Sequence, residues 1–503
     1  MVTARLTIDP HFTVGKVNRR LFGSFVEHLG RCVYDGLYEP GHSTADADGF
    51  REDVIELVKE LGVSAIRYPG GNFVSGFRWE DSVGPVAERP RRLDLAWHST
   101  ETNEVGLHEF STWLDKVGSE LMLAINLGTR GTLEALDILE YSNIASGTAL
   151  SDQRVANGKT DAFGVKMWCL GNEMDGPWQL GHRSADDYGK IASQTAKAMR
   201  QIDPDLELVA CGSSGAHMPT FGEWERVVLT HTYDDVDYIS CHAYYEEKNG
   251  DLGSFLASAV DMDHFIESVV ATADHVKAVL GSEKTINISF DEWNVWYIDR
   301  YHDVDKLQGL DNWPVAPRLL EDAYSVADAV VFGNLLISLL RHADRVTSAS
   351  LAQLVNVIAP IMTEPDGPAW RQTTFFPFAL TSRLATGDAL DVKLEAGTYD
   401  TEVYGTVSLV DAVATHDRET GLTSVFLVNR SQTEDATITI DTAALGAVEV
   451  REAQTLSDSD FSAKNVLDDR DRVGLTANET VVLGDTSLTI TLPPVSWTAL
   501  SLA

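Results

Sequence analysis

Cysteine, long apolar runs and basic residues are all scarce in this chain of 503 residues. The four cysteines, Cys32, Cys169, Cys211 and Cys241, match no zinc-binding spacing and are too few for a disulfide-rich scaffold. No run approaches the ~20 apolar residues of a membrane-spanning helix. The N-terminal residues show neither the apolar stretch nor the cleavage site of a signal peptide. These absences predict a cytoplasmic protein with no membrane partner.

The shortage of basic residues sets the net charge. There are 39 lysines and arginines against 76 aspartates and glutamates, which gives a formal charge of -37. A chain of this kind repels nucleic acid and anionic membrane surfaces, whereas a neutral ligand is indifferent to the field. We therefore expect no nucleic-acid partner, and we attribute the acidity to solubility.

Motifs for phosphate-bearing cofactors and for catalytic zinc are also missing. The sequence has no G-x-G-x-x-G motif after a predicted strand, no P-loop and no H-E-x-x-H. The segment Asp46–Gly49 resembles part of a calcium loop, but the twelfth position would be Ile55, which has no carboxylate for the ion. We therefore expect neither a cofactor nor a metal site.

From about residue 20 to residue 385, short apolar runs alternate with segments of helical spacing. The helical spacing is clear in residues 50–61, 185–202, 262–280 and 323–340. Strands that alternate with helices are typical of parallel βα units, and eight such units close into a barrel. The eight candidate strands are Leu21–Val26, Ser64–Tyr68, Glu120–Leu127, Lys166–Leu170, Glu207–Ala210, Tyr238–Cys241, Ile286–Phe290 and Thr347–Leu351.

After about residue 386 the helical spacing stops, and short alternating strands separated by turns rich in Asp, Gly and Asn take its place. This pattern is typical of an antiparallel β-sandwich, to which the alternating N-terminal run Thr3–Ile8 can add one strand. We predict a (β/α)8 TIM barrel over residues 18–385 and a β-sandwich formed by residues 1–17 and 386–503. The expected C-terminal strands are Thr401–Val410, Thr423–Val428, Ala436–Ile440, Thr480–Leu483 and Ser487–Leu492.

Two glutamates occupy the positions where function is expected in such a barrel. Glu173 follows the fourth predicted strand and Glu292 follows the seventh, and the carboxyl ends of the strands form the active-site face of a (β/α)8 barrel. A single glutamate at a strand end is more often solvated or salt-bridged than catalytic. A pair is what a retaining glycosidase needs, one as nucleophile and one as general acid/base, with ~5–5.5 Å between them.

The other predicted strand ends are polar as well, with Glu27, Arg67, Asn72, Asn126, Asn172, Ser213, His242, Tyr244 and Gln353 at or just after them. Such groups suit a polyhydroxylated ligand, because each sugar hydroxyl both donates and accepts hydrogen bonds. His242 alone is equally typical of a packed core histidine, but its spacing to Tyr244 places both on one side of a strand. Trp178, Trp293 and Trp296 lie nearby in the sequence and can cover the apolar faces of a sugar.

Five segments carry a resemblance that covers essentially the whole chain. They are Arg67–Gly76, Leu93–Asn103, Gly171–Gln179, Asp291–Tyr297 and Ala352–Asn356. In these segments the chain resembles the intracellular, exo-acting α-L-arabinofuranosidases of glycoside hydrolase family 51. The resemblance implies a barrel paired with a β-sandwich, a retaining mechanism, and an arabinofuranosyl oligosaccharide as substrate.

The resemblance also implies roles for individual residues. Glu173 would be the acid/base and Glu292 the nucleophile. The arabinofuranosyl ring would be bound by Glu27, Asn72, Asn172, Tyr244 and Gln353, with Arg67, His242 and Trp296 as further candidates. Intracellular family members often form hexamers, so a homo-oligomer is expected from the resemblance alone. The sequence departs from the family pattern at Phe77-Arg78 and in the loop Glu246–Ser254, both on the leaving-group side.

Two other classes stay open at this point. A retaining glycosidase of the same clan that acts on a pyranoside, such as a xyloside or a β-glucan, would carry the same two carboxylates. A panel of substrates separates that class from an arabinofuranosidase. A non-catalytic carbohydrate-binding barrel is the other class, but it would have no need of both Glu173 and Glu292.

Overall fold

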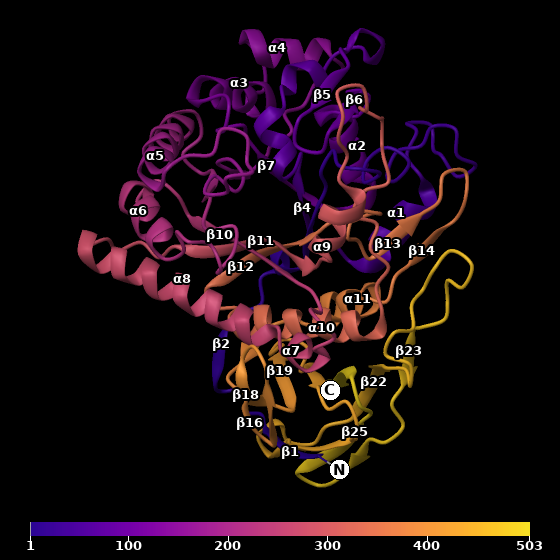
Figure 1. The fold of residues 1–503 in the computed structure, drawn as a ribbon. Coiled ribbons are helices and arrows are strands. Elements are labelled where there is room, and N and C mark those ends of the chain that lie inside the picture. The colour runs from indigo at the N-terminus through magenta and orange to yellow at the C-terminus, as the bar shows by residue number, and fades with distance from the viewer. Residues whose placement is uncertain (1) are drawn as a thin grey trace.

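The eight predicted strands form a closed barrel in the computed structural model, which describes residues 2–503 (Figure 1). Neighbouring strands follow the order β10-β11-β12-β3-β4-β7-β8-β9, and all of them pair in parallel. The strands are β3 (Gly23–Phe25), β4 (Ala65–Tyr68), β7 (Glu120–Ala124), β8 (Met167–Cys169), β9 (Glu207–Ala210), β10 (Tyr238–Tyr245), β11 (Asn287–Val295) and β12 (Val346–Ala352). The predicted (β/α)8 barrel is confirmed.

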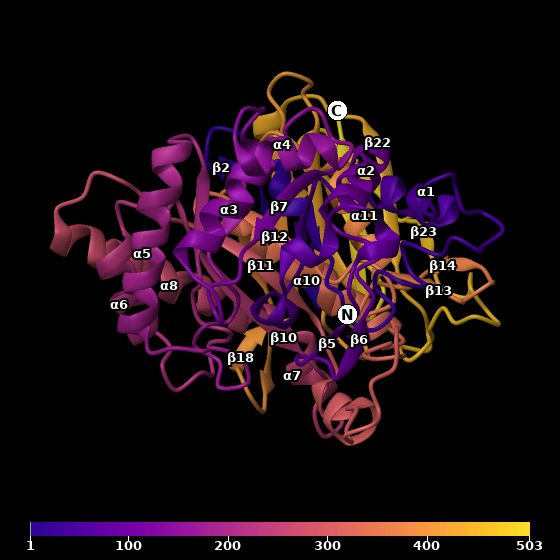
Figure 2. The same cartoon turned by 90° about the horizontal axis from the view of Figure 1, so that it is seen from above.

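Helices surround the barrel, as the view from above shows (Figure 2). They are α1 (Glu52–Leu61), α2 (Leu107–Val117), α3 (Thr132–Asn143), α4 (Ala149–Ala156), α5 (Ala185–Ile202), α6 (Glu223–Thr232), α7 (Leu252–Leu256), α8 (Ala259–Leu280), α9 (Ile298–Arg300), α10 (Val326–Arg341) and α11 (Phe375–Leu384). The prediction for residues 185–202 coincides with α5, and the other three predicted helices begin two or three residues away from the observed starts. Among residues 2–503 no helix combines the length and apolarity that a membrane crossing requires.

Two further sheets form the sandwich, below the barrel in Figure 1. One sheet has the order β16-β1-β21-β25-β24 and the other β2-β15-β19-β20-β26-β22-β23. Their strands are β1 (Val2–Thr7), β2 (Thr13–Lys16), β15 (Asp388–Leu390), β16 (Lys393–Ala396), β19 (Val410–His416), β20 (Thr423–Asn429), β21 (Ala436–Asp441), β22 (Val450–Leu456), β23 (Leu475–Ala477), β24 (Val482–Leu483), β25 (Ser487–Leu492) and β26 (Ser496–Leu502). The N-terminal strand therefore belongs to the sandwich as expected, although its pairing with β21 is parallel. The exact boundaries at 17/18 and 385/386 stay predictions.

The expected single strand Thr401–Val410 is wrong. The chain instead makes a hairpin of β17 (Thr398–Thr401) and β18 (Gly405–Ser408), and β19 starts at Val410. The direction reverses between Thr401 and Gly405, which pair across the turn, and Gly405 takes a φ of 69° that favours glycine. Alternation of apolar and polar residues continues through such a tight turn, so the sequence pattern conceals it. Two other short pairs complete the strands: β5 (Arg92–Asp94) with β6 (Ser99–Glu101), and β13 (Ile361–Thr363) with β14 (Ala369–Arg371).

Helix α10 lies between the barrel and the sandwich, and it is buried from Val326 to Leu340 (Figure 1). The side chains of β26 serve two cores, because Leu500 packs between the two sheets while Trp497 packs with the barrel core. A Cβ at Gly333 of α10 would lie 2.3 Å from Cδ1 of Trp497, so only glycine lets the helix approach this closely. The two modules therefore share one continuous packed boundary.

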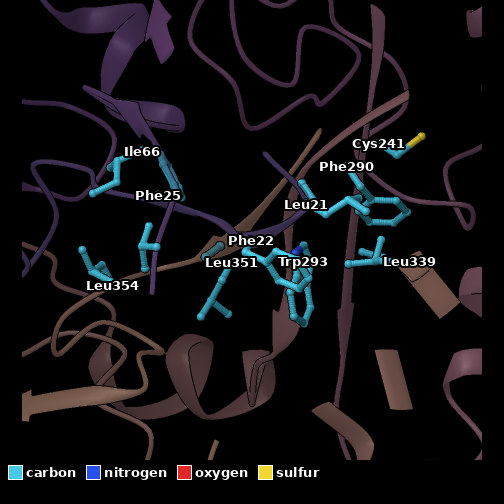
Figure 3. Packing of buried hydrophobic residues seen from close by; sticks show 14 of the residues in the cluster. Leu21, Phe22, Phe25, Ile66, Cys241, Phe290, Trp293, Leu339, Leu351 and Leu354 are labelled. Atoms are coloured by element: carbon cyan, nitrogen blue, oxygen red, sulfur yellow. The ribbon is translucent and has the colours of Figure 1, made fainter. Parts of the chain in front are cut away.

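The interior beneath the barrel is apolar. Phe22, Phe290, Leu339 and Leu351 pack in the same buried cluster as Trp293 (Figure 3). The Trp293 ring is fully buried and lies 4.8 Å from the ring of Phe332 on α10. Trp293 therefore supports the core and does not cover a sugar face, contrary to the expectation from its place in the sequence.

Candidate active site

The sequence-predicted residues come together at the carboxyl end of the barrel strands. Glu27 follows β3, Arg67 lies in β4, Asn172 and Glu173 follow β8, and Gln353 follows β12. The remaining predicted residues are Asn72, which begins the 3-10 helix η2 (Asn72–Gly76), His242 and Tyr244 in β10, Glu292 in β11, and Trp296 just after β11.

The sequence predicts Glu292 just after the end of its strand, but in the structure Glu292 lies inside β11 (Asn287–Val295). β11 continues to Val295, and its register against β12 shifts between Phe290 and Trp293. β10 likewise extends to Tyr245, so that His242 pairs with Glu292. The apolar pattern stops at Phe290 because the next residues are acidic, yet the barrel accommodates them with cationic partners from other strands.

Two donors orient the carboxylate of Glu292. Arg67 Nη1 donates to Glu292 Oε1 at 2.8 Å, and the Tyr244 hydroxyl donates to Glu292 Oε2 at 2.7 Å. Burial and the charge of Glu292 raise the pKa of Tyr244 well above its ordinary value, so the phenol keeps its proton as a donor. Arg67 Nη2 also donates to Asn172 Oδ1 at 2.7 Å, which connects β4 to the loop after β8.

Glu173 sits at a sharp turn. Its φ of 43° is left-handed, which a non-glycine residue adopts rarely, and β8 ends four residues earlier at Cys169. The Trp178 indole donates to Glu173 Oε2 at 2.7 Å, and His242 Nδ1 lies 2.9 Å from Glu173 Oε1. The turn therefore directs the carboxyl group of Glu173 toward β10 and β11.

His242 joins three acidic residues. Its Nε2 lies 2.9 Å from Asp291 Oδ1, and its Nδ1 faces Glu173 at 2.9 Å and Glu292 Oε2 at 3.6 Å. Burial acts to lower the pKa of His242, but the charges and hydrogen bonds of Glu292, Asp291 and Glu173 outweigh it and raise the pKa well above the ordinary value. His242 and Tyr244 do point the same way, toward the carboxylate pair.

The two predicted catalytic carboxylates are close together. One oxygen of Glu173, one oxygen of Glu292 and one nitrogen of His242 all lie within 4.8 Å of one another. That separation fits the ~5–5.5 Å of a retaining pair, and an inverting pair would need ~6.5–9.5 Å to admit a water. Two carboxylates and one imidazole could also hold a divalent metal. Metal binding would require His242 to lose the proton that the neighbouring carboxylates stabilise.

Glu27 forms a second polar group beside the pair. Its Oε1 accepts from the Phe73 amide at 2.9 Å and from the Trp97 indole at 2.8 Å, and Gln353 Nε2 donates to Oε2 at 3.1 Å. Burial raises the pKa of Glu27 to about 8 against these hydrogen bonds, helped by the charges of Glu292 and Asp94. A Cβ at Gly70 would lie 2.4 Å from Glu27 Cγ, so this turn must be glycine.

The remaining predicted residues border the same space. Asn172 Nδ2 donates to Asn72 Oδ1 at 3.3 Å, and the half-buried Trp296 ring meets the Tyr244 ring edge-on at 5.0 Å. Two other members of the polar ring have structural contacts instead. Asn126 caps its own loop by bonding Ser75 O and Thr129, and the Ser213 amide donates to Glu225.

Sequence reasoning missed Asp291 and Trp97 as parts of the site. Asp291 is buried between His242 and Arg67, whose Nε lies 3.7 Å from Asp291 Oδ2. Trp97 reaches Glu27 from the β5–β6 hairpin, 70 residues along the chain. Both lie within segments that match the family pattern, and that match was the only signal for them.

Comparison with known proteins identifies the family. Residues 57–251 match the model of the "Alpha-L-arabinofuranosidase 1 domain", and residues 291–496 match that of the "Alpha-L-arabinofuranosidase C-terminal domain". The chain is 61% identical to an intracellular exo-α-(1→5)-L-arabinofuranosidase of Streptomyces lividans, covering all of this chain and 76% of the relative. It is also 61% identical to an exo-α-(1→6)-L-arabinofuranosidase of Bifidobacterium longum, covering 99% and 96%.

A solved structure agrees over the whole fold. The family 51 α-L-arabinofuranosidase AbfB from Bifidobacterium longum superposes with a TM-score of 0.96 at 50% identity, covering 99% of each chain. An α-L-arabinofuranosidase from Thermotoga maritima gives a TM-score of 0.87 at 31% identity, again covering 99% of each chain. The chain belongs to the α-L-arabinofuranosidases of glycoside hydrolase family 51.

Proposed function

We propose that this chain is a retaining, exo-acting α-L-arabinofuranosidase that releases terminal arabinofuranosyl residues from oligosaccharides inside the cell, with Glu292 as nucleophile and Glu173 as acid/base. The observation that carries the proposal is the close pair of buried carboxylates, bridged by His242 at the mouth of the barrel. The two relatives at 61% identity are named for different linkages, so the proposal covers the furanosyl group and leaves the linkage open.

In the first step Glu292 attacks the anomeric carbon while Glu173 gives its proton to the departing oxygen. The bond to the leaving group breaks, and a covalent ester forms between the sugar and Glu292. Arg67 and Tyr244 hold the Glu292 carboxylate in position for this attack. Water then attacks the same carbon, gives its proton to Glu173, and releases Glu292 as a carboxylate with net retention.

Charge balance supports these roles. Arg67 and the His242 imidazolium supply two positive charges, whereas Glu173, Asp291 and Glu292 could supply three negative ones. Because an uncompensated buried charge is costly, the cluster favours one protonated carboxyl group. Glu292 accepts from Arg67 and Tyr244, whereas the contacts of Glu173 are His242 and the Trp178 indole, so Glu173 is the carboxyl group that we assign as the general acid.

The other predicted residues would bind the sugar. Glu27, Asn72, Asn172 and Gln353 present carboxyl and amide groups around the pair, and Trp296 offers an aromatic face beside Tyr244. Asn172 is assigned to the 2-hydroxyl, a contact expected to strengthen in the transition state. A homo-oligomer, with a hexamer as the family precedent, stays part of the proposal and rests on the resemblance alone.

The test is hydrolysis of 4-nitrophenyl α-L-arabinofuranoside beside the β-D-xylo- and β-D-glucopyranosides. Wild type should cleave only the furanoside with retention, as followed by proton NMR, and Glu292→Ala should lose at least ~10⁴-fold in kcat. Glu267→Ala, an exposed glutamate on α8, is the matched control and should be unaffected. Cleavage of a pyranoside alone would preserve the mechanism and overturn the substrate, and inactivity on all three would overturn the proposal.

A further inference from the structure

A large cleft opens beside the loop that follows Glu173. Its volume is about 720 Å³. Its walls are the segment 73–81, the β5–β6 hairpin, the loop 126–130 and Leu180. Pockets for small ligands span ~300–1,000 Å³, so this one has room for more than a single sugar ring. Neither Glu173 nor Glu292 lines it, so the cleft lies outside the carboxylate pair itself.

The loop that follows Glu173 connects the cleft to the carboxylate pair. Trp178 donates to Glu173 Oε2, and Leu180, two residues further on, forms part of the cleft wall. Gln179, between them, donates to Ser75 Oγ at 2.5 Å and so fixes this loop against η2. In the proposed mechanism Glu173 gives its proton to the leaving oxygen, which places the leaving group beside this loop.

Three arginines line the cleft, and two of them are already paired. Arg130 forms two hydrogen bonds of 2.7 Å with Glu80, and Arg92 Nε donates to Asp81 at 2.7 Å. The third, Arg78, is exposed, and its guanidinium has no hydrogen-bond or ion-pair partner among residues 2–503. In a chain with about two acidic residues for each basic one, a guanidinium without a carboxylate is available to a ligand.

Apolar side chains complete the surface. Leu93 and Leu95 on the hairpin are 56% and 59% exposed although both line the cleft. Phe77 lies beside Arg78 and is half-buried. Sugar rings present alternating hydroxyl groups and patches of C–H, which match donors such as a guanidinium and apolar contacts of this kind.

We propose, resting on the function proposed above, that this cleft binds a linear oligosaccharide leaving group of at least two sugar rings, with Arg78 as its polar anchor. Arg78 donates to ring hydroxyls, while Leu93 and Leu95 contact the C–H faces. Substrates with a longer leaving group are therefore preferred over those with a small one, and Arg78 is the residue that sets this preference.

The test compares kcat/KM for 4-nitrophenyl α-L-arabinofuranoside with kcat/KM for linear α-L-arabinofuranosyl di-, tri- and tetrasaccharides. Wild type should gain efficiency up to the trisaccharide. Arg78→Gln should lose roughly tenfold on the tri- and tetrasaccharides, mainly through KM, and stay unchanged on the nitrophenyl substrate. Leu93→Ser should show the same selective loss, and Arg226→Gln, an exposed arginine on α6, should show none.

The outcomes separate the two proposals. Efficient cleavage of the nitrophenyl furanoside without any gain from chain length would overturn the cleft assignment and leave the activity standing. An equal loss on all substrates in Arg78→Gln would also overturn it, because a general structural effect does not depend on the leaving group. Absence of furanoside cleavage by wild type would overturn both proposals together.

Discussion

Asp291 is the residue whose replacement tests the charge balance of the site most directly. In Asp291→Asn the side chain keeps its shape and one oxygen that can accept from His242 Nε2, but its negative charge is lost. Glu173 and Glu292 would then face Arg67 and His242 as two charges against two. The cluster would be neutral with Glu173 ionised, so the proton that the general acid needs would be held less firmly.

The expected loss of kcat/KM in Asp291→Asn follows from the hydrogen bond between His242 Nε2 and residue 291, which weakens when the carboxylate becomes an amide. A hydrogen bond to a charged group contributes about 1.5–3 kcal/mol, which corresponds to roughly a ten- to hundredfold loss in kcat/KM. The loss should fall on substrates that need protonation of the leaving oxygen, such as an arabinofuranosyl disaccharide. A 2,4-dinitrophenyl arabinofuranoside leaves without a proton, so its hydrolysis should be much less affected.

The assay is the pH profile of kcat/KM for both substrates, with Ser289→Ala as control. Ser289 is buried on the same strand and its hydroxyl has no hydrogen-bond partner within residues 2–503, so its removal should change little. In Asp291→Asn the alkaline limb for the disaccharide should move to lower pH. An equal loss on both substrates with an unmoved limb would refute the reasoning and leave Asp291 a purely structural role.

Two other predictions concern residues that we propose to bind the sugar. Asn172→Ala should lower kcat more than it raises KM, because the contact with the 2-hydroxyl strengthens in the transition state, and steady-state kinetics showing a change confined to KM would contradict this. Glu27 has a folded pKa of about 8, above its ordinary 4.5, so the folded state binds the extra proton between these values. The proton on Glu27 therefore contributes to stability fully below about pH 4.5, and this contribution is lost as the pH rises through about 8. Glu27→Gln has no such proton to lose. Between pH 5.5 and pH 9 the melting temperature of wild type should therefore fall further than the melting temperature of Glu27→Gln.

The barrel could be predicted from the sequence because each of its strands is a short apolar run followed by a polar residue. The eight predicted runs all overlap observed strands, and the helix over residues 185–202 was placed without error. The sandwich was predicted less completely. Its strand β26 is buried along its whole length, since its two faces pack against different cores, and so it lacks the alternation that identifies a half-exposed strand.

The proposed catalytic pair can also be predicted from the sequence, but the groups that hold it cannot. Glu173 and Glu292 stand out because acidic residues directly after apolar runs are unusual. The sequence gives no separate signal for Asp291, which directly precedes Glu292. Its partner His242 is 49 residues away along the chain, and Arg67, which it also faces, is further still. Contacts between residues so far apart in the sequence depend on which strands become neighbours in the barrel. A local sequence pattern does not indicate the order of the strands.

The same long-range arrangement accounts for how one site would serve both halves of the proposed reaction. In the mechanism proposed above, Glu292 and Asp291 carry negative charge before the attack and Glu173 holds the proton, so two negative charges face Arg67 and His242. After the attack, Glu292 is a neutral ester and Glu173 has lost its proton, so Glu173 and Asp291 are the two negative charges. The number of buried charges is unchanged while the acid becomes a base, because β4, β8, β10 and β11 each contribute a group to one cluster. Asp291 is the constant member of that balance, and its loss should therefore impair proton transfer in both steps.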